Sequence, residues 1–183
     1  MTYDDAALLQ AARKLGADAL VAVFDYYAPA LYKYALRLCC DTAEADDIVG
    51  EVFTQLLKHL KEGKGPRDNL RSYLYQSAYH KVVDNARDRK HLTALEDGVT
   101  LMSGDALPSQ HEDQEERDAV EAIILNQLSE DQRHVIVLRF IENFSLKETA
   151  EIVGKNENNV KVIQNRALTR LRNALGSRPE DTP

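Results

Sequence analysis

The chain has 183 residues and carries 30 acidic against 23 basic side chains, a formal net charge of −7 at pH 7. This length fits one or two small domains, and a hydrophobic content of 44% is enough for a packed core and too high for general disorder. No apolar run approaches the ~20 residues of a membrane span, and the acidic start MTYDDAALLQ lacks the basic region of a secretory signal. We therefore expect a cytoplasmic protein without a membrane segment.

The two cysteines, Cys39 and Cys40, are neighbours in the sequence. Two thiols do not complete a tetrahedral metal site, and adjacent residues of a helix point in different directions. We expect both to be small packing residues in a reducing compartment. No nucleophile–base pair, glycine-rich phosphate loop or metal-ligand spacing occurs, so we predict no catalytic residues, no metal, no cofactor and no enzymatic activity.

Charge is divided into blocks along the chain. Residues 56–92 hold nine lysines and arginines against four acids, and residues 133–175 hold eight against four. Residues 94–116 hold seven acids and residues 40–55 hold five, in both cases without a lysine or arginine. The basic blocks indicate two contacts with a polyanion, and the acidic blocks indicate contacts with something basic.

Residues 1–92 predict a bundle of helices. Apolar residues recur every three or four positions from Val21 to Leu38, which places them on one helical face. Pro29 falls inside this run. Because proline lacks the backbone donor and crowds the preceding turn, we expect the helix to break or kink there.

Two further helices follow in this half. Asp41 begins a capping-box pattern that opens a helix over residues 42–60. Glycine and proline in the segment 63–66 end that helix and form a loop. A third helix starts near Asn69 and runs toward Arg89.

Residues 93–116 lose all periodicity and combine glycine, serine and proline with acids, a composition typical of a flexible linker. Periodicity returns at Ala119 and predicts a helix through Leu128. Ser129 then opens a capping box for a helix that reaches about Ile141.

No segment alternates with period two, so we predict an all-α protein. It consists of two small helical bundles, residues 1–92 and 117–176, joined by the flexible acidic linker 93–116 and followed by a tail at 177–183.

The stretch from Ser145 to Leu175 predicts a helix-turn-helix. Ala150 is small enough for a second helix to approach the first, and Gly154 accepts the backbone conformation of the turn. Val160 pins the second helix to the first. An ordinary helical hairpin with a solvated face is the alternative.

The second of these helices carries amides and cations on its predicted outer face. Such side chains read base edges and hold phosphates in the major groove. The candidate DNA-contacting residues are Asn156, Asn158, Asn159, Lys161, Gln164, Asn165, Arg166 and Arg170. Asn156 is also a candidate cap of the helix.

The motifs LSEDQR (128–133), VIVLRF (135–140) and FSLKETAEIVG (144–154) resemble the sigma-four domain of bacterial sigma factors. The LuxR-type response-regulator domain has a similar pattern, so this half alone leaves both open. The motifs LYKYALRL (31–38), AEADDIV (43–49) and LRSYLY (70–75) resemble the sigma-two domain of the same proteins. The chain thus resembles, over residues 5–175, the extracytoplasmic-function group of the sigma-seventy family.

The resemblance implies that the helix 42–60 grips a coiled coil of the largest subunit of RNA polymerase. Acids around apolar anchors suit a basic coiled coil. The implied core polymerase-binding residues are Asp46, Asp47, Ile48, Glu51 and Val52. A carboxylate site for a divalent metal is the competing reading. Gly50 departs from the family, which often has Gln at this position.

The resemblance also implies that the helix beginning near Leu70, with the loop before it, opens DNA at the minus-ten element. Rings among cations suit unpaired bases, because rings stack and cations hold phosphates. The candidate residues are Arg67, Asp68, Asn69, Arg71, Tyr75, Tyr79, His80, Lys81 and Arg87. Tyr73, between Leu70 and Leu74, is assigned to the core.

In this family the helix-turn-helix reads the minus-thirty-five element, the linker threads the polymerase cleft, and an anti-sigma protein usually restrains the whole. We therefore predict a sigma factor that binds core RNA polymerase and promoter DNA. Two alternatives are a regulator that binds an operator without core polymerase and a helical protein-interaction adaptor.

Overall fold

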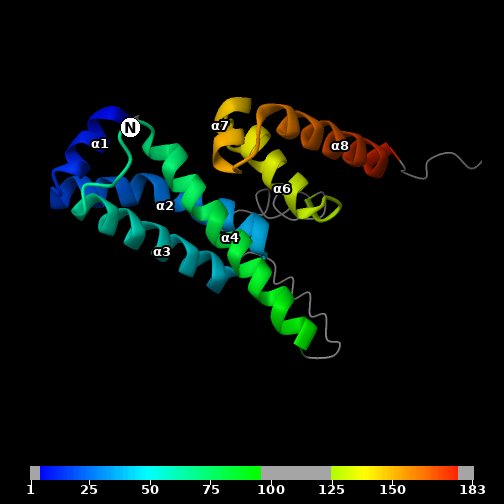
Figure 1. Cartoon of the computed structure of the whole chain (residues 1–183), viewed down its shortest axis with the longest axis horizontal. Coiled ribbons are helices and arrows are strands. Elements are labelled where there is room, and N and C mark those ends of the chain that lie inside the picture. Colours follow the sequence, from blue (N-terminus) through cyan, green and yellow to red (C-terminus); the bar gives the residue numbers. More distant parts are fainter. Residues whose placement is uncertain (1–4, 96–124, 177–183) are drawn as a thin grey trace, which may run out of the picture. The chain divides into compact units, whose positions relative to one another are not determined.

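The computed structural model describes residues 5–95 and 125–176, which belong to two compact units, 1–105 and 106–183 (Figure 1). Every regular element within these described residues is a helix, which confirms the all-α prediction. Most of the predicted linker, the first part of the helix predicted from Ala119, and the tail lie outside the described residues.

The described part of unit 1 is a helical bundle with the elements α1 (Asp5–Arg13), α2 (Ala17–Cys39), α3 (Thr42–Lys61) and α4 (Leu70–Leu95). α2 packs against α3 and α4, α3 packs against α4, and α1 contacts α2 and α4. Figure 1 shows α2 and α3 side by side with α4 lying across them. Fully buried side chains from each of the long helices, including Tyr34, Leu56 and Leu74, fill the space between them.

α2 runs without interruption through Pro29, so the predicted break is wrong. Tyr27 and Leu31, on either side of the proline, are both buried in the bundle, whereas Pro29 itself is exposed. Packing on both sides of the proline outweighs the local cost of the missing donor.

The corner between α2 and α3 is built by Cys40 and Asp41. Cys40 is exposed and has a left-handed backbone (φ 57°), so it is not the packing residue that was predicted. Cys39 is half-buried, and burial raises the pKa of its thiol to about 11. Asp41 caps α3 as predicted, because its side chain accepts a hydrogen bond from the backbone N–H of Glu44 at 2.9 Å.

α4 begins after Asn69, whose side-chain oxygen accepts a hydrogen bond from the backbone N–H of Ser72 at 2.9 Å. This bond makes Asn69 the cap of the helix. α4 extends to Leu95 and therefore includes the first residues of the predicted linker.

The described part of unit 2 contains α6 (Glu130–Ile136), the π-helical turn η1 (Val137–Ile141), α7 (Leu146–Ile152) and α8 (Glu157–Gly176). α8 packs against α6 and α7. The helix predicted as far as Ile141 is an α-helix only to Ile136. In η1 the backbone N–H of Glu142 bonds to the carbonyl of Val137 at 2.9 Å, and the wider turn is followed by the buried Phe144.

The helix-turn-helix forms as predicted. Ser145 and Glu148 make both bonds of a capping box at the start of α7, at 3.2 and 2.9 Å. Gly154 has a positive φ of 63° in the turn, a conformation that favours glycine. Asn156 caps α8 by accepting a hydrogen bond from the backbone N–H of Asn159 at 2.8 Å.

His134 on α6 is an ionisable side chain in the core of unit 2, with only 1% of its surface exposed. Burial lowers its pKa to about 4 from 6.5, and Glu130 and Asp131 offset only part of this effect. Arg133 and Lys155 add to the lowering.

Between pH 6.5 and pH 4 the unfolded chain binds a proton at His134 that the folded unit does not bind, so the free energy of unfolding falls as the pH is lowered through this window. We expect a loss of up to about 3 kcal/mol in unit 2, at 1.36 kcal/mol per pKa unit. Native-state hydrogen exchange of the α6 and α8 amides measures this loss in the wild type and in His134→Gln. If the free energy of unfolding depended equally on pH in the two proteins, His134 would not be its cause.

Candidate nucleic-acid interface

The predicted polymerase-binding residues on α3 separate into two groups. Asp46, Asp47 and Glu51 are exposed on the outer face of the helix. Ile48 and Val52 are buried inside the bundle, which corrects their assignment as polymerase-contacting anchors. Residues at these spacings point inward because α3 packs against both α2 and α4.

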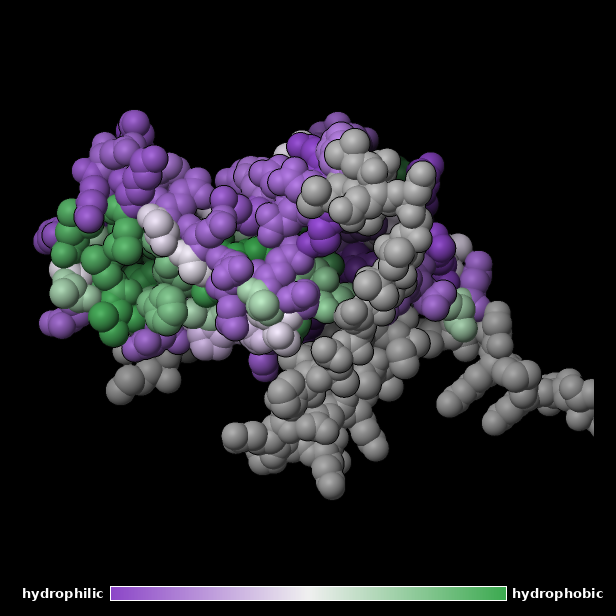
Figure 2. Space-filling view, turned by 90° about the horizontal axis from the view of Figure 1, so that it is seen from below, coloured by the Kyte–Doolittle hydropathy of each residue, from purple (hydrophilic) through white to green (hydrophobic). Residues whose placement is uncertain are grey.

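Exposed apolar side chains instead lie where α2 begins and α3 ends. Val21, Phe24 and Leu57 are exposed, Phe24 by 46%. The Phe24 ring lies against Phe53, with centroids 4.8 Å apart. Figure 2 shows hydrophobic surface gathered at this end of unit 1. We call Val21, Phe24 and Leu57 the apolar patch. Sequence periodicity placed Val21 and Phe24 on the buried face.

Two ion pairs join α3 to α4. Glu51 lies 2.5 Å from the ammonium of Lys81, and both side chains are partly in water. Glu44 accepts hydrogen bonds from Asn85, at 3.1 Å, and from Arg89. The hydrogen bond that Arg89 donates to the Glu44 carboxylate raises the pKa of Arg89. Because only 16% of the Glu44 side chain is exposed, this pair is less screened by solvent than the Glu51 pair.

The tyrosines of α4 do not lie where the sequence placed them. Tyr75 and Tyr79 are buried, and the Tyr75 ring packs against Tyr34 at 5.1 Å between centroids. Their predicted contact with bases is therefore corrected, because neither ring is available at the surface. Tyr73, assigned to the core, is only half-buried, and its hydroxyl shares a hydrogen bond with His59 at 2.7 Å.

Tyr73, His80 and Arg87 are spaced by seven residues and so lie on one side of α4. His80 and Arg87 are exposed, and Arg87 forms an exposed ion pair with Asp84 at 3.7 Å. The sequence contained this signal, since a spacing of seven returns to the same helical face while Leu70 and Leu74 define a different one.

The remaining predicted minus-ten residues have varied surroundings. Arg67 and Asp68 are exposed in the loop before α4. Asn69 uses its side-chain oxygen as the helix cap. Arg71 is half-buried and its guanidinium lies over the Tyr75 ring at 5.3 Å, and Lys81 is paired as described.

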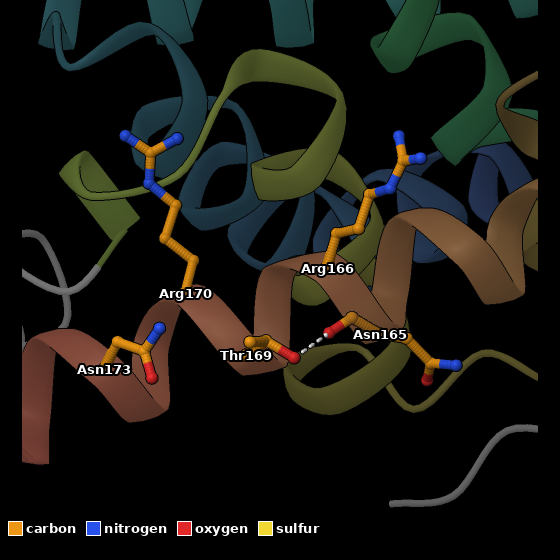
Figure 3. A pocket seen from close by; sticks show the side chains of 5 residues that line it. All are labelled: Asn165, Arg166, Thr169, Arg170 and Asn173. Carbon is orange, nitrogen blue, oxygen red and sulfur yellow. Dashed lines mark hydrogen bonds between the residues drawn. The ribbon is translucent and has the colours of Figure 1, made fainter.

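α8 exposes most of the predicted DNA-contacting residues. Asn158, Asn159 and Lys161 lie exposed in its first two turns. Further along, a shallow groove is lined by Asn165, Arg166, Thr169, Arg170 and Asn173 (Figure 3). Arg166 and Arg170 extend from the same side of the helix, away from the Asn165 side chain.

Gln164 departs from the predicted outer face. It is half-buried, and its side-chain oxygen accepts a hydrogen bond from Nε of Arg139 at 3.1 Å. Arg139 also donates to the carbonyl of Phe144. Gln164 therefore ties α8 to η1, and the prediction that it faces outward is corrected. Val162, between Lys161 and Ile163, is an exposed apolar side chain on α8.

The geometry defines a class of protein: a helix-turn-helix unit with a polar and cationic second helix, and a helical bundle with separate acidic, apolar and basic surfaces. Both family comparisons agree with this description. Residues 23–92 match the family Sigma-70 region 2, and residues 124–173 match Sigma-70, region 4.

Relatives extend the match over most of the chain. It is 31% identical over 160 residues to the ECF RNA polymerase sigma factor SigX of Bacillus subtilis, covering 82% of this chain and 80% of SigX. It is 26% identical over 176 residues to the ECF RNA polymerase sigma factor BldN of Streptomyces coelicolor, covering 95% of this chain and 66% of BldN.

Among solved structures, the sigma factor RpoE in complex with the anti-sigma factor NepR from Bartonella quintana aligns with a TM-score of 0.72 and 25% identity, covering 85% of this chain and 96% of RpoE. The chain belongs to the ECF group of sigma-70 family RNA polymerase sigma factors. A sigma factor directs RNA polymerase to promoters and is not an enzyme. Membership of this family therefore confirms the predicted sigma-factor function and the prediction that the chain is not an enzyme. In the described residues no helix combines the length and apolarity of a membrane span.

Glu44, Asn85 and Arg89, here called the Glu44 cluster, yield a prediction about the stability of α4. Replacing Glu44 with Ala removes the hydrogen bonds that Asn85 and Arg89 donate to it, and hydrogen bonds to charged groups contribute about 1.5–3 kcal/mol. We expect the variant to lower the free energy of unfolding by about 1–2 kcal/mol and to speed amide hydrogen exchange in the last turns of α4. Glu62→Ala removes an exposed pair with Lys64 and is the matched control, expected to stay within about 0.5 kcal/mol. Equal effects of the two changes would refute this.

Proposed function

We propose that the two units of this sigma factor divide the promoter between them. Unit 1 binds core RNA polymerase through α3 and contacts the minus-ten element through α4, and unit 2 contacts the minus-thirty-five element through α8. The observation that carries the proposal is the outer face of α8, where Asn158, Asn159 and Lys161 stand clear of the helix-turn-helix core.

The proposed polymerase surface combines acids with the apolar patch. Asp46 and Asp47 supply negative charge on α3, and Phe24 and Leu57 supply the apolar anchors in place of the buried Ile48 and Val52. An apolar centre with a charged rim is the usual composition of a protein interface. Glu51 belongs to the same surface and holds Lys81 as well.

The proposed minus-ten surface is the side of α4 that carries Tyr73, His80 and Arg87, with Arg67 and Asp68 in the preceding loop. A half-exposed ring on a helix that also carries cations suits stacking on an unpaired base, which contributes about 1–3 kcal/mol. The Glu44 cluster holds the distal part of α4 against α3, so that the basic end of the helix keeps its direction.

On α8 we assign Arg166 and Arg170 to phosphates, because both extend from one side of the helix (Figure 3). Asn158, Asn159 and Asn165 are the candidates for base edges, since an amide donates and accepts and so pairs with adenine. Lys161 is assigned to phosphate. Asn156 acts first as the cap of α8.

We also propose that the chain acts in the cytoplasm and that an anti-sigma protein restrains it. RpoE, to which the chain is similar, was solved with such a partner. The apolar patch suits a protein partner of this kind. We further propose that the acidic linker 93–116 lies in the cleft of the polymerase.

Run-off transcription with purified core polymerase tests the function as a whole. We expect promoter-dependent transcripts. Lys161→Ala should weaken promoter binding by the holoenzyme equally on all sequences, because phosphate contacts carry no base information. Asn158→Ala should change sequence preference by about 1–3 kcal/mol at one base pair.

Two results point to the alternatives. A DNA shift by the chain alone, without transcripts from the mixture, identifies an operator-binding regulator. Neither shift nor transcript, from a folded chain, identifies an adaptor.

The polymerase surface is tested by reversing one charge. Asp47→Arg should reduce co-purification with core polymerase at least tenfold, because a like charge then faces the basic partner. Asp88→Arg, an exposed acid on α4, is the control and should bind core as the wild type does. Undiminished binding by Asp47→Arg would remove α3 from the interface.

A further inference from the structure

Val162 is an apolar side chain at the centre of a polar surface. It lies roughly 200° around the axis of α8 from Val160, whose side chain is fully buried. It is 47% exposed. Asn158 lies one turn before it and Asn165 one turn after it, and both are exposed as well.

Packing within the helix-turn-helix does not account for Val162. α8 is held to α6 and α7 by the opposite stripe, which contains Val160 and Ala167, both fully buried. Nor does helix propensity favour valine at an exposed position, because its branched Cβ loses rotamer freedom in a helix. Val162 thus lies on the same exposed face of α8 as Asn158 and Asn165, which the proposed function assigns to base edges.

We propose that Val162 is a specificity-determining residue that contacts the C5-methyl group of a thymine in the major groove. This methyl is the one apolar group that a base pair presents there, and apolar side chains recognise it by contact. The inference rests on the proposed function of α8 and adds to it the identity of a base.

The neighbours of Val162 support the choice of thymine. Asn158 and Asn165 flank it on the same row, and asparagine pairs through two bonds with adenine. A row of amide, valine and amide therefore matches a run that contains A·T pairs in both orientations. Position also favours the assignment, since Val162 is in the second turn of α8 and the first turns of a recognition helix reach the base edges.

The experiment uses holoenzyme assembled from core polymerase and the full chain. Holoenzyme first selects its preferred upstream element from a randomised duplex library. Each thymine of that element is then replaced singly by deoxyuridine, which removes only the methyl group. We expect one replacement to weaken binding about fourfold, the effect of one apolar methyl. Val162→Ala should bind the thymine duplex several-fold more weakly and should not distinguish thymine from uracil at that position.

Lys161→Ala is the matched control from the adjacent position: it should weaken binding to both duplexes equally and keep the fourfold difference between them. Three results would overturn this inference but not the proposed function. The wild type could bind every deoxyuridine duplex as well as the thymine duplex, or the selected element could contain no thymine. The third is a Val162→Ala variant that still distinguishes thymine from uracil. Failure of holoenzyme to select any element overturns the proposed function, and this inference with it. An unchanged thermal unfolding curve shows that the Val162→Ala variant is folded.

Discussion

Burial of one stripe on a helix decides which side chains of that helix remain for a partner. On α8 the stripe is Val160 and Ala167, which pack against α6 and α7, and every residue on the opposite side is thereby turned to solvent. On α4 the stripe is Leu70, Leu74 and Ala78. Rotation of either helix by a single residue position, about 100°, would replace the whole set of exposed groups.

Polar cross-links then fix these rotations. Apolar packing tolerates small rotations, whereas a hydrogen bond between side chains requires a particular distance and direction. Arg139 holds Gln164 and with it the rotation of α8. Glu44 does the same for the distal part of α4 through Asn85 and Arg89. In the described part of each unit, apolar stripes are thus combined with charged or amide cross-links between helices.

Local sequence was sufficient to predict the long helices and the caps of α3, α7 and α8, although not the π-helical turn η1. Asp41 and Ser145 form the bonds that their spacing to Glu44 and Glu148 indicates, and Gly154 takes the positive φ that the turn requires. Such features depend on contacts within four residues, so no tertiary information is needed. Pro29 was misread because the packing that holds α2 through it comes from other helices.

The functional surfaces were harder to predict, because tertiary contacts decide them. Tyr73 and Tyr75 differ by two positions, yet Tyr75 meets Tyr34 of α2 while Tyr73 stays half-exposed. Gln164 was predicted to contact bases, but its side chain accepts a hydrogen bond from Arg139 of η1, a contact that the sequence pattern does not reveal. Sequence periodicity gives each helix an apolar face and does not say whether a core or a partner covers it. Phe24 and Val162 are both exposed, and only the tertiary structure shows this, so the contacts proposed for them could not be predicted from periodicity.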